Sequence, residues 1–320
     1  MIRAGIFGSA GYTGGELIRI LTDHPDVELS FIHSKSKADR AVSEVHRDLF
    51  YMDRNFDSEM NEDVDVIFLC MGHGQSSDFL AGNHLPENVR IIDLSQDHRI
   101  DSPDHHFVYG LPEFQRSGIR EASHIANPGC FATAIQLALL PLAKNHRLTE
   151  DIHIHGITGS TGAGQSLSET GHFSWRNNNV SVYKAFRHQH LSEVNQTIRK
   201  CQKNWGHQIH FVPLRGNFTR GILISAYMNL DASKDEVVQT YKEYYLEHPF
   251  VRVTHENPDI KQVVNTNYCL LNIRKYGHQI HIISVIDNLL KGASGQAVQN
   301  MNLMFDLEED CGLHLKSIAF

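Results

Sequence analysis

The sequence predicts an α/β protein of two domains, in which a doubly wound parallel sheet precedes an α+β domain with a mixed or antiparallel sheet. The first observation is that apolar strands alternate with helical stretches up to about residue 130. The second is that later segments alternate apolar and polar residues, as antiparallel strands do. The third is the length, since 320 residues favour about two domains.

The first domain is expected over residues 1–129. IRAGIFG predicts a strand, and a helix over 14–24 should follow it, because its leucines and isoleucines fall on one face. Further strands are predicted at 27–33, 63–72 and 90–95. Strands that alternate with helices in this way form a parallel sheet through right-handed crossovers, which is the Rossmann-type arrangement.

The second domain is expected over residues 130–286, and an apolar helix over 130–146 should open it. Its strands are predicted from the segments IHFVP, ILISAYMNL, CLLNIRK and QIHIISVI. A last helix is predicted over 287–305, and the C-terminal segment 287–320 is expected to join the first domain.

Charge and hydropathy exclude several classes of partner. The chain has 29 Lys and Arg against 37 Asp and Glu, a net charge of −8, and no basic run. We therefore expect neither nucleic acid nor an anionic membrane as a partner. No stretch approaches the roughly 18 consecutive apolar residues of a membrane span, and the N-terminus does not resemble a signal peptide. A cytoplasmic location is expected.

Cysteine and histidine spacing gives no metal site. The five cysteines are scattered and lack a CxxC pair, which argues against disulfides and structural zinc. Histidine is unusually frequent, with 22 copies. Residues i and i+3 of a strand point to opposite faces, so the two HQIH segments should not bind a metal through their own histidines. The pairs with ligand-like spacing are His153/His155, His188/His190, His207/His210 and His278/His281.

A glycine-rich loop follows the first predicted strand. Small residues let a backbone approach phosphates, and a helix N-terminus offers free N–H groups and a positive dipole end. The spacing GxxGxxG is a variant of the usual dinucleotide fingerprint, and the alternative is a turn whose glycines serve packing. Nucleotide binding is favoured, with contacts from Gly8, Ser9, Gly11, Tyr12, Thr13 and Gly14.

The end of the second strand indicates which nicotinamide cofactor binds. An NAD site usually has an acidic side chain there for the ribose 2′-hydroxyl. This chain has Ser34, Lys35 and Ser36 instead, which suit a 2′-phosphate. The sequence therefore predicts NADP(H), and a solvated basic turn is the alternative.

Cys130 is the predicted nucleophile. It follows Asn-Pro-Gly and opens the apolar helix, where unpaired N–H groups and the helix dipole stabilise a thiolate. A cysteine in this position favours covalent catalysis through a thioester. The alternative, a buried small hydrophobic residue, suits Cys70 and Cys269 better, because both lie in apolar strands.

Several motifs in one order resemble the N-acetyl-γ-glutamyl-phosphate reductase family, within the wider aspartate-semialdehyde dehydrogenase-like group. IANPGCFATA around Cys130 is similar to the family's active-site signature. The resemblance continues along the whole chain in GSAGYTGGEL, DLSQDHR, YGLPE, GSTGAG, YKAFRHQHLSEV and DNLLKGASGQAVQNMNLM. The wider group shares the cysteine and DN-x-x-KGA elements and lacks the HxHxxE segment.

The resemblance implies that NADPH reduces N-acetyl-L-glutamyl 5-phosphate to the 5-semialdehyde in arginine biosynthesis, with release of phosphate. A histidine suits the proton transfers, since its pKa lies near operating pH. His190 is the favoured acid/base and His188 a substrate contact, with their order left open. The loop with Ser160 and Gly162 is predicted to bind phosphate through backbone N–H groups. Asn288 is assigned to the nicotinamide carboxamide, and the candidate substrate contacts are Glu113, Asn127, Lys184 and Arg220.

Two positions depart from the family pattern, and some alternatives stay open. His98 stands where the family commonly has Phe, and Gln165 where a basic residue often follows GAG. An N-succinyl-glutamyl or an N-acyl-aminoadipyl phosphate is therefore an alternative substrate, since one methylene is worth only about 1–3 kcal/mol of discrimination. The alternative from another class is an NADP-binding redox sensor. A homo-oligomer, dimer or tetramer, is expected.

Overall fold

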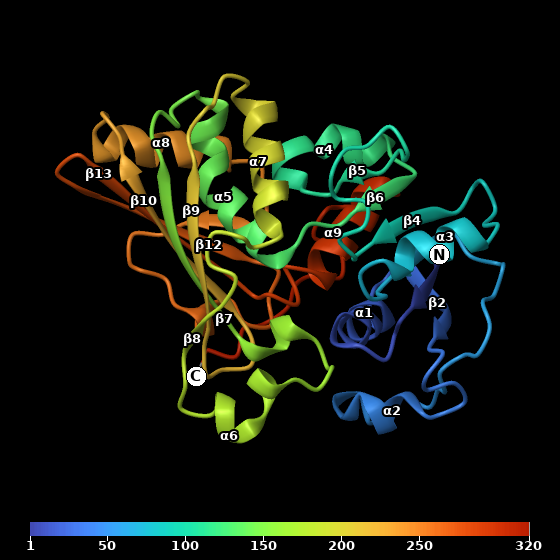
Figure 1. Cartoon of the computed structure of the whole chain (residues 1–320). Coiled ribbons are helices and arrows are strands. Elements are labelled where there is room, and N and C mark those ends of the chain that lie inside the picture. The colour runs from blue at the N-terminus through green and yellow to red at the C-terminus, as the bar shows by residue number, and fades with distance from the viewer. Residues whose placement is uncertain (320) are drawn as a thin grey trace. The chain divides into compact units, whose positions relative to one another are not determined.

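The computed structural model describes residues 1–319, which form two compact units. The first unit comprises Met1–Pro128 and Ala293–His314, and the second comprises Gly129–Gly292 and 315–319 (Figure 1). The sequence placed all of 287–320 with the first domain, whereas 287–292 and 315–319 belong to the second unit.

The first unit is built on a six-stranded sheet in which every strand pair is parallel. The strand order is β2-β1-β3-β4-β6-β5. The third strand is buried along its whole length, as its apolar sequence predicts. The strands are β1 Ile2–Phe7, β2 Val27–His33, β3 Val66–Leu69, β4 Arg90–Asp93, β5 Val108–Tyr109 and β6 His124–Ala126.

Helices α1 and α4 of this unit pack against the late helix α9, so the C-terminal part of the chain completes the first unit. The helices are α1 Tyr12–Thr22, α2 Val42–Val45, α3 Gln75–Gly82, α4 Pro112–Glu121 and α9 Ser294–Met304. The sequence predicted the last helix from residue 287, and this start is wrong. The Asp287 carboxylate accepts the backbone N–H groups of Leu289 and Leu290, which holds the segment before α9 in turns.

The second unit contains a seven-stranded sheet of order β11-β12-β13-β10-β7-β9-β8. It is mixed, because β7 pairs with β9 and β11 with β12 in parallel, while the other neighbours are antiparallel. The predicted fold class is thus confirmed. The strands are β7 Ile152–Thr158, β8 Ser181–Val182, β9 Ile209–Arg215, β10 Ile222–Asn229, β11 Val251–Val253, β12 Cys269–Tyr276 and β13 Gln279–Ile286.

One face of this sheet is covered by helices of the same unit. Helix α5 (Cys130–Lys144) packs on β10 and β13, and α7 (His190–Cys201) and α8 (Lys234–Tyr244) pack against α5 (Figure 1). Every residue of α5 from 131 to 143 is buried, as expected of a helix that is apolar all round. The short helix α6 spans Phe173–Arg176. Among residues 1–319, no helix combines the length and apolar character needed to cross a membrane.

Candidate active site

The glycine-rich loop joins β1 to α1, and two of its glycines are required by packing. Gly8 has a φ of +71°, and a Cβ there would lie 2.5 Å from the carbonyl oxygen of Cys70. A Cβ at Gly14 would lie 2.5 Å from the Cα of Ser9. Gly11 has more room, since its nearest neighbour is a carbonyl at 3.5 Å. The glycines therefore let the loop turn tightly between the strand and the helix.

The N-terminus of α1 is suited to an anion. Gly11 is its N-cap residue and provides no side-chain cap, and the first turn contains no acidic residue. The positive end of the helix dipole is thus not neutralised by the helix's own side chains. Tyr12 and Thr13 occupy this first turn, and the Thr13 carbonyl accepts a hydrogen bond from Ser294 of α9.

The predicted 2′-phosphate contacts follow β2 directly. Ser34 is buried and its backbone N–H donates to the carbonyl of Asp57, while Lys35 and Ser36 are exposed. The Ser9 hydroxyl donates to the carbonyl of His33, the last residue of β2. The start of the glycine loop is therefore tied to the end of the strand that carries these residues.

Cys130 is the first residue of α5, as predicted, and is partly exposed. The N-cap residue Gly129 supplies no side chain, and its backbone N–H donates to the buried Glu193 carboxylate at 2.9 Å. Gly292 lies against the cysteine, since a Cβ at that position would come 2.8 Å from Cys130 Cβ. A glycine is needed there to leave space for Cys130.

The structure brings both predicted histidines next to the start of α5. His188 and His190 are buried, and their ring centroids lie 4.6 Å apart. Phe131, which follows Cys130, packs edge-on against both rings at 5.4 and 6.4 Å. The Nδ1 of His188 accepts the backbone N–H of His190, so a neutral His188 carries its proton on Nε2.

The electrostatics distinguish His188 from an ordinary histidine. Burial lowers its pKa to about 4, and the positive charges of Lys184 and Arg215 add to this effect. His188 is therefore neutral near pH 7. A group with so low a pKa is poorly matched to proton transfer at neutral pH and can instead act as a hydrogen-bond donor through Nε2.

Three residues of this region, Tyr183, Glu193 and Arg215, were not predicted from the sequence as part of the site. The Tyr183 ring lies 4.7 Å beneath the Arg215 guanidinium, and burial raises the pKa of Tyr183 to about 12, with Cys130 adding to the rise. Glu193 links α7 to the N-cap of α5. The HxHxxE spacing is a signal that could have identified Glu193, and Tyr183 opens the YKAFRHQHLSEV motif, whereas Arg215 lies in none of the motifs.

The predicted phosphate-binding role of the 160–164 loop needs correction. The backbone N–H groups of Ser160 and Thr161 donate to the carbonyls of Phe218 and Thr219, and that of Gly162 donates within the loop. These groups are engaged by the protein, because the loop is joined to the 218–219 segment. The Ser160 hydroxyl is the remaining candidate contact.

Both polar atoms of the Asn288 side-chain amide make hydrogen bonds within the second unit. Its Oδ1 accepts the Gly221 N–H at 2.7 Å, and its Nδ2 donates to Thr161 Oγ1 at 3.0 Å. The neighbouring Asp287 is fully buried and pairs with Arg220 at 3.0 Å. Asn288 therefore joins the 160–164 loop to the Arg220 segment, and its assignment to the nicotinamide stays a prediction.

Of the other candidate substrate contacts, Glu113 and Asn127 lie in the first unit, and both are buried. Asn127 donates to the Ala293 carbonyl and accepts from Asn300, so its amide ties α9 to β6. Lys184, in the second unit, is exposed and donates to Gln189. These contacts to substrate stay predictions.

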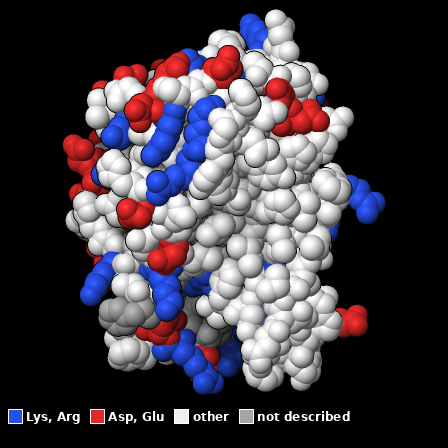
Figure 2. Space-filling view, turned by 90° about the vertical axis from the view of Figure 1, so that its left-hand side faces the viewer, with Lys and Arg blue, Asp and Glu red and all other residues white. Residues whose placement is uncertain are grey.

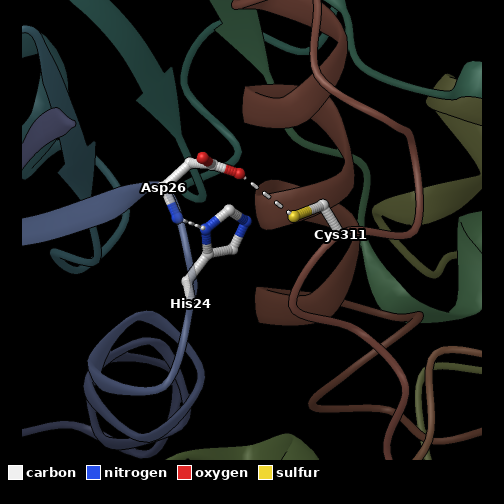
Figure 3. A group of neighbouring side chains, drawn as sticks. All are labelled: His24, Asp26 and Cys311. Atoms are coloured by element: carbon white, nitrogen blue, oxygen red, sulfur yellow. Dashed lines mark hydrogen bonds between the residues drawn. The ribbon is translucent and has the colours of Figure 1, made fainter.

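One group of metal-ligating residue types occurs among residues 1–319, and its atoms are already hydrogen-bonded. His24 and Asp26 lie between α1 and β2, and Cys311 follows α9 (Figure 3). His24 Nδ1 accepts the Asp26 N–H. Its Nε2 faces Asn302 Oδ1 at 3.1 Å, and Asn302 Nδ2 is used to donate elsewhere, so Nε2 carries the proton. Neither nitrogen offers a lone pair to a metal.

Comparison with known proteins first defines the class. Residues 3–122 match the model "Semialdehyde dehydrogenase, NAD binding domain", and residues 130–288 match "Semialdehyde dehydrogenase, dimerisation domain". The fold agrees with aspartate semialdehyde dehydrogenase II from Vibrio cholerae, with a TM-score of 0.74 at 16% identity over 96% of this chain and 98% of that one.

Full-length relatives then give the family. The chain is 55% identical to N-acetyl-gamma-glutamyl-phosphate reductase of Parabacteroides distasonis and 53% identical to that of Bacteroides fragilis, over 100% of both chains in each case. It belongs to the N-acetyl-gamma-glutamyl-phosphate reductase family, as the motifs around Cys130 predicted.

Proposed function

We propose that this chain reduces N-acetyl-L-glutamyl 5-phosphate to N-acetyl-L-glutamate 5-semialdehyde through a thioester on Cys130, with NADPH as the reductant. The proposal is supported by the relatives named N-acetyl-gamma-glutamyl-phosphate reductase and by the match of residues 3–122 to an NAD binding domain. Arginine biosynthesis is the pathway that the resemblance implies. The observation that supports the mechanism is that Cys130 begins α5 and that the next residue, Phe131, packs against His188 and His190.

Cys130 performs the covalent chemistry. Its thiolate attacks the acyl carbon, a C–S bond forms, the C–O bond to phosphate breaks and phosphate leaves. A nicotinamide cofactor, when bound, supplies the hydride that reduces the thioester. The resulting oxyanion on the former acyl carbon then collapses, the C–S bond breaks, and Cys130 is again a thiolate. Atoms and charge balance when the one proton that the overall reaction takes up ends on the released phosphate. A second proton can join the oxyanion and is given back as the C–S bond breaks.

His190 is proposed to hold and return that proton. It begins α7, and Glu193 of the same helix is tied to Gly129, so α7 is fixed against the residue before Cys130. His188 is neutral and carries its proton on Nε2, so this N–H group can donate a hydrogen bond to an oxygen of the substrate. Arg215, Arg220 and Lys184 supply positive charge for the substrate's anionic groups.

The residues of the first unit fit a dinucleotide, because α1 begins with an uncapped, uncharged turn after a tight glycine loop. Gly8, Ser9, Gly11 and Thr13 would hold the pyrophosphate. Ser34, Lys35 and Ser36 would hold a 2′-phosphate, which favours NADP(H) over NAD.

Cofactor preference gives the first test. Replacing Lys35 with Asp removes a cation and adds an anion near the proposed 2′-phosphate, so the NADPH/NADH ratio of kcat/KM should fall at least about tenfold. Lys203→Asp, an exposed lysine of the second unit, serves as the control and should leave the ratio unchanged. Equal kcat/KM for both cofactors in the unmodified chain would contradict the assignment.

Phosphate dependence tests the acyl-phosphate chemistry. Run in reverse with NADP⁺, the enzyme must release its thioester to inorganic phosphate, whereas a hydrolytic aldehyde dehydrogenase uses water. We expect turnover of N-acetylglutamate semialdehyde to stop after the first equivalent in phosphate- and arsenate-free buffer, and to resume when phosphate is added. Steady turnover without phosphate would argue against the mechanism.

The same assay resolves the substrate. N-acetyl, N-succinyl and N-acyl-aminoadipate semialdehydes are compared by kcat/KM under one set of conditions. We expect the N-acetylglutamate compound to be preferred, and a larger value for another acyl group would replace it as the substrate.

Self-association is the remaining part of the proposal. The match of residues 130–288 to a dimerisation domain supports a homo-oligomer, and we infer a dimer. A cytoplasmic location stays a prediction.

A further inference from the structure

The glycine-rich loop between β1 and α1 contains no charged side chain. Residues 8–15 read GSAGYTGG, whereas the pyrophosphate of a nicotinamide dinucleotide is anionic. Recognition of the pyrophosphate by this loop therefore depends on backbone N–H groups and on the positive end of the helix dipole. Backbone donors are effective only when their peptide planes are held in the right orientation, so the residues that fix the loop are as important as the loop.

Ser9, near the start of this loop, is held from two directions. Its side chain is fully buried. Its backbone N–H and its hydroxyl both donate to the carbonyl of His33, at 3.2 and 2.8 Å. Its own carbonyl accepts a hydrogen bond from Nε2 of His46 at 2.8 Å. Every polar group of Ser9 is thus engaged within the first unit.

His46 is itself firmly placed. It follows the short helix α2 and is only 8% exposed. Its backbone N–H donates to the Val42 carbonyl, and its ring packs edge-on against buried Phe56 with centroids 5.9 Å apart. A carbonyl oxygen can only accept, so Nε2 of His46 carries the proton. The imidazole is therefore a fixed donor that approaches the loop from a distant part of the sequence.

Gly15 provides the space for this imidazole. A Cβ at position 15 would lie 2.6 Å from both Nδ1 and Cε1 of His46, which is well inside van der Waals contact. Glycine is also a poor helix former, yet Gly15 lies within α1. The packing of His46 against α1 gives a physical reason for a glycine at this position.

The hydrogen bond from His46 fixes the peptide unit that joins Ser9 to Ala10. This peptide is trans, so the Ser9 carbonyl and the Ala10 N–H lie in one plane and point in opposite directions. Because the carbonyl is directed toward His46, the N–H is directed away from it. Ala10 is partly exposed, and its N–H donates to no group among residues 1–319. This donor is therefore available to an anion at the loop.

We propose that His46 is a positioning residue of the cofactor site, which directs the Ala10 N–H toward the pyrophosphate of the nicotinamide dinucleotide. The inference rests on the cofactor binding proposed above, and it adds a donor and a distant residue to that site. The pyrophosphate is common to NADPH and NADH. Loss of the His46 donor should therefore weaken both cofactors by the same factor, whereas substitution of Lys35 should change the ratio between them.

The experiment measures the dissociation constants of NADPH and NADH for the full chain by fluorescence titration. His46→Leu removes the donor and keeps a side chain of similar bulk, so both constants should rise about tenfold. His46→Gln places an amide donor near the former Nε2 position and should restore both constants to within about threefold of the unmodified chain. His105→Leu is the matched control and should leave them unchanged, because His105 Nε2 also donates to a backbone carbonyl of the first unit, that of Ile100.

A second variant tests the same donor from the side of α1. Gly15→Ala should displace the His46 ring and weaken both cofactors about as much as His46→Leu does. The double variant should bind no more weakly than either single variant, because both changes remove one interaction. Additive losses in the double variant would contradict a shared cause.

A fragment of the cofactor identifies the part that His46 serves. Adenosine 2′-phosphate lacks the pyrophosphate, so its dissociation constant should be the same in His46→Leu and in the unmodified chain. These ligands are anionic, and Lys and Arg also lie elsewhere on the surface, among Asp and Glu, as Figure 2 shows for one side of the molecule. The titrations are therefore run in about 0.15 M NaCl, which screens exposed charges.

Turnover separates this role from the reaction. At saturating NADPH, kcat of His46→Leu should stay within about twofold of the unmodified chain while KM for NADPH rises. Unchanged cofactor binding in His46→Leu overturns the role of His46, and so does an equal loss of affinity for adenosine 2′-phosphate or a folded His46→Gln variant that binds no better than His46→Leu. An unmodified chain that binds NADPH without turnover counts against the reaction alone, and one that binds neither cofactor overturns the cofactor site together with this role.

Discussion

Cys130→Ser is expected to lose nearly all turnover while it still binds NADPH. The reaction needs one group that attacks the acyl phosphate and is later expelled from the reduced carbon. A thiolate does both, whereas an alkoxide is harder to generate and to expel. The substitution leaves Gly8–Gly14 unchanged, so cofactor binding measured by fluorescence titration should be retained. We expect kcat to fall by at least about 10³-fold.

Selective alkylation tests the same assignment without a mutation. Limited treatment with iodoacetamide, followed by mass mapping, should modify Cys130 first and inactivate the enzyme in parallel. The other thiols are less reactive, because burial raises the pKa of Cys70 to about 12 and also raises that of Cys201 and Cys311, while Cys269 is fully buried. Inactivation that follows labelling of another cysteine, or a serine variant with substantial activity, would show that the thioester mechanism is wrong.

His190→Asn should lower kcat by about 10²–10⁴-fold with little change in NADPH affinity, as expected for a general acid–base group. His188→Asn should act mainly on KM for the acyl phosphate, because a histidine with a pKa of about 4 is neutral at working pH and contributes a hydrogen bond. Asparagine keeps a polar amide near the Nδ1 position and removes the Nε2 group, so it limits structural damage. Thermal unfolding of both variants checks that each remains folded.

The pH profile separates the two roles. A pH-dependent inflection of kcat that arises from His190 as the acid–base group should be absent in His190→Asn and present in His188→Asn. A larger kcat loss in His188→Asn, with His190→Asn near normal, would exchange the two assignments.

Local sequence patterns predicted much of the fold and the centre of the site. The parallel sheet follows from alternating strands and helices, and β2 begins and ends at the predicted residues, 27 and 33. Cys130 was identifiable because a helix start is a local feature, defined by Asn-Pro-Gly and the apolar run after it. The close packing at Gly14 is similarly local, since its neighbour is Ser9, whereas Gly8 lies against Cys70, which follows β3 and is distant in sequence.

Other features depended on contacts between segments far apart in sequence. The 160–164 loop has the composition of a phosphate site, but the N–H groups of Ser160 and Thr161 donate to the carbonyls of residues 218 and 219, which no local pattern shows. Tyr183 and Arg215 reach the His188 region through the pairing of β8 with β9.

The sequence by itself determined the fold class and the family resemblance, and it predicts Cys130 as the nucleophile, because these depend on periodicity, on motifs in order and on a helix start. The tertiary structure decided which histidines are neighbours. His188 and His190 meet beside Phe131 of α5, while His153, His210 and His281 lie in one row of the sheet. The physical reason is register: which side chains become neighbours across a sheet is set by long-range strand pairing, and a shift of one residue would move each of them to the opposite face.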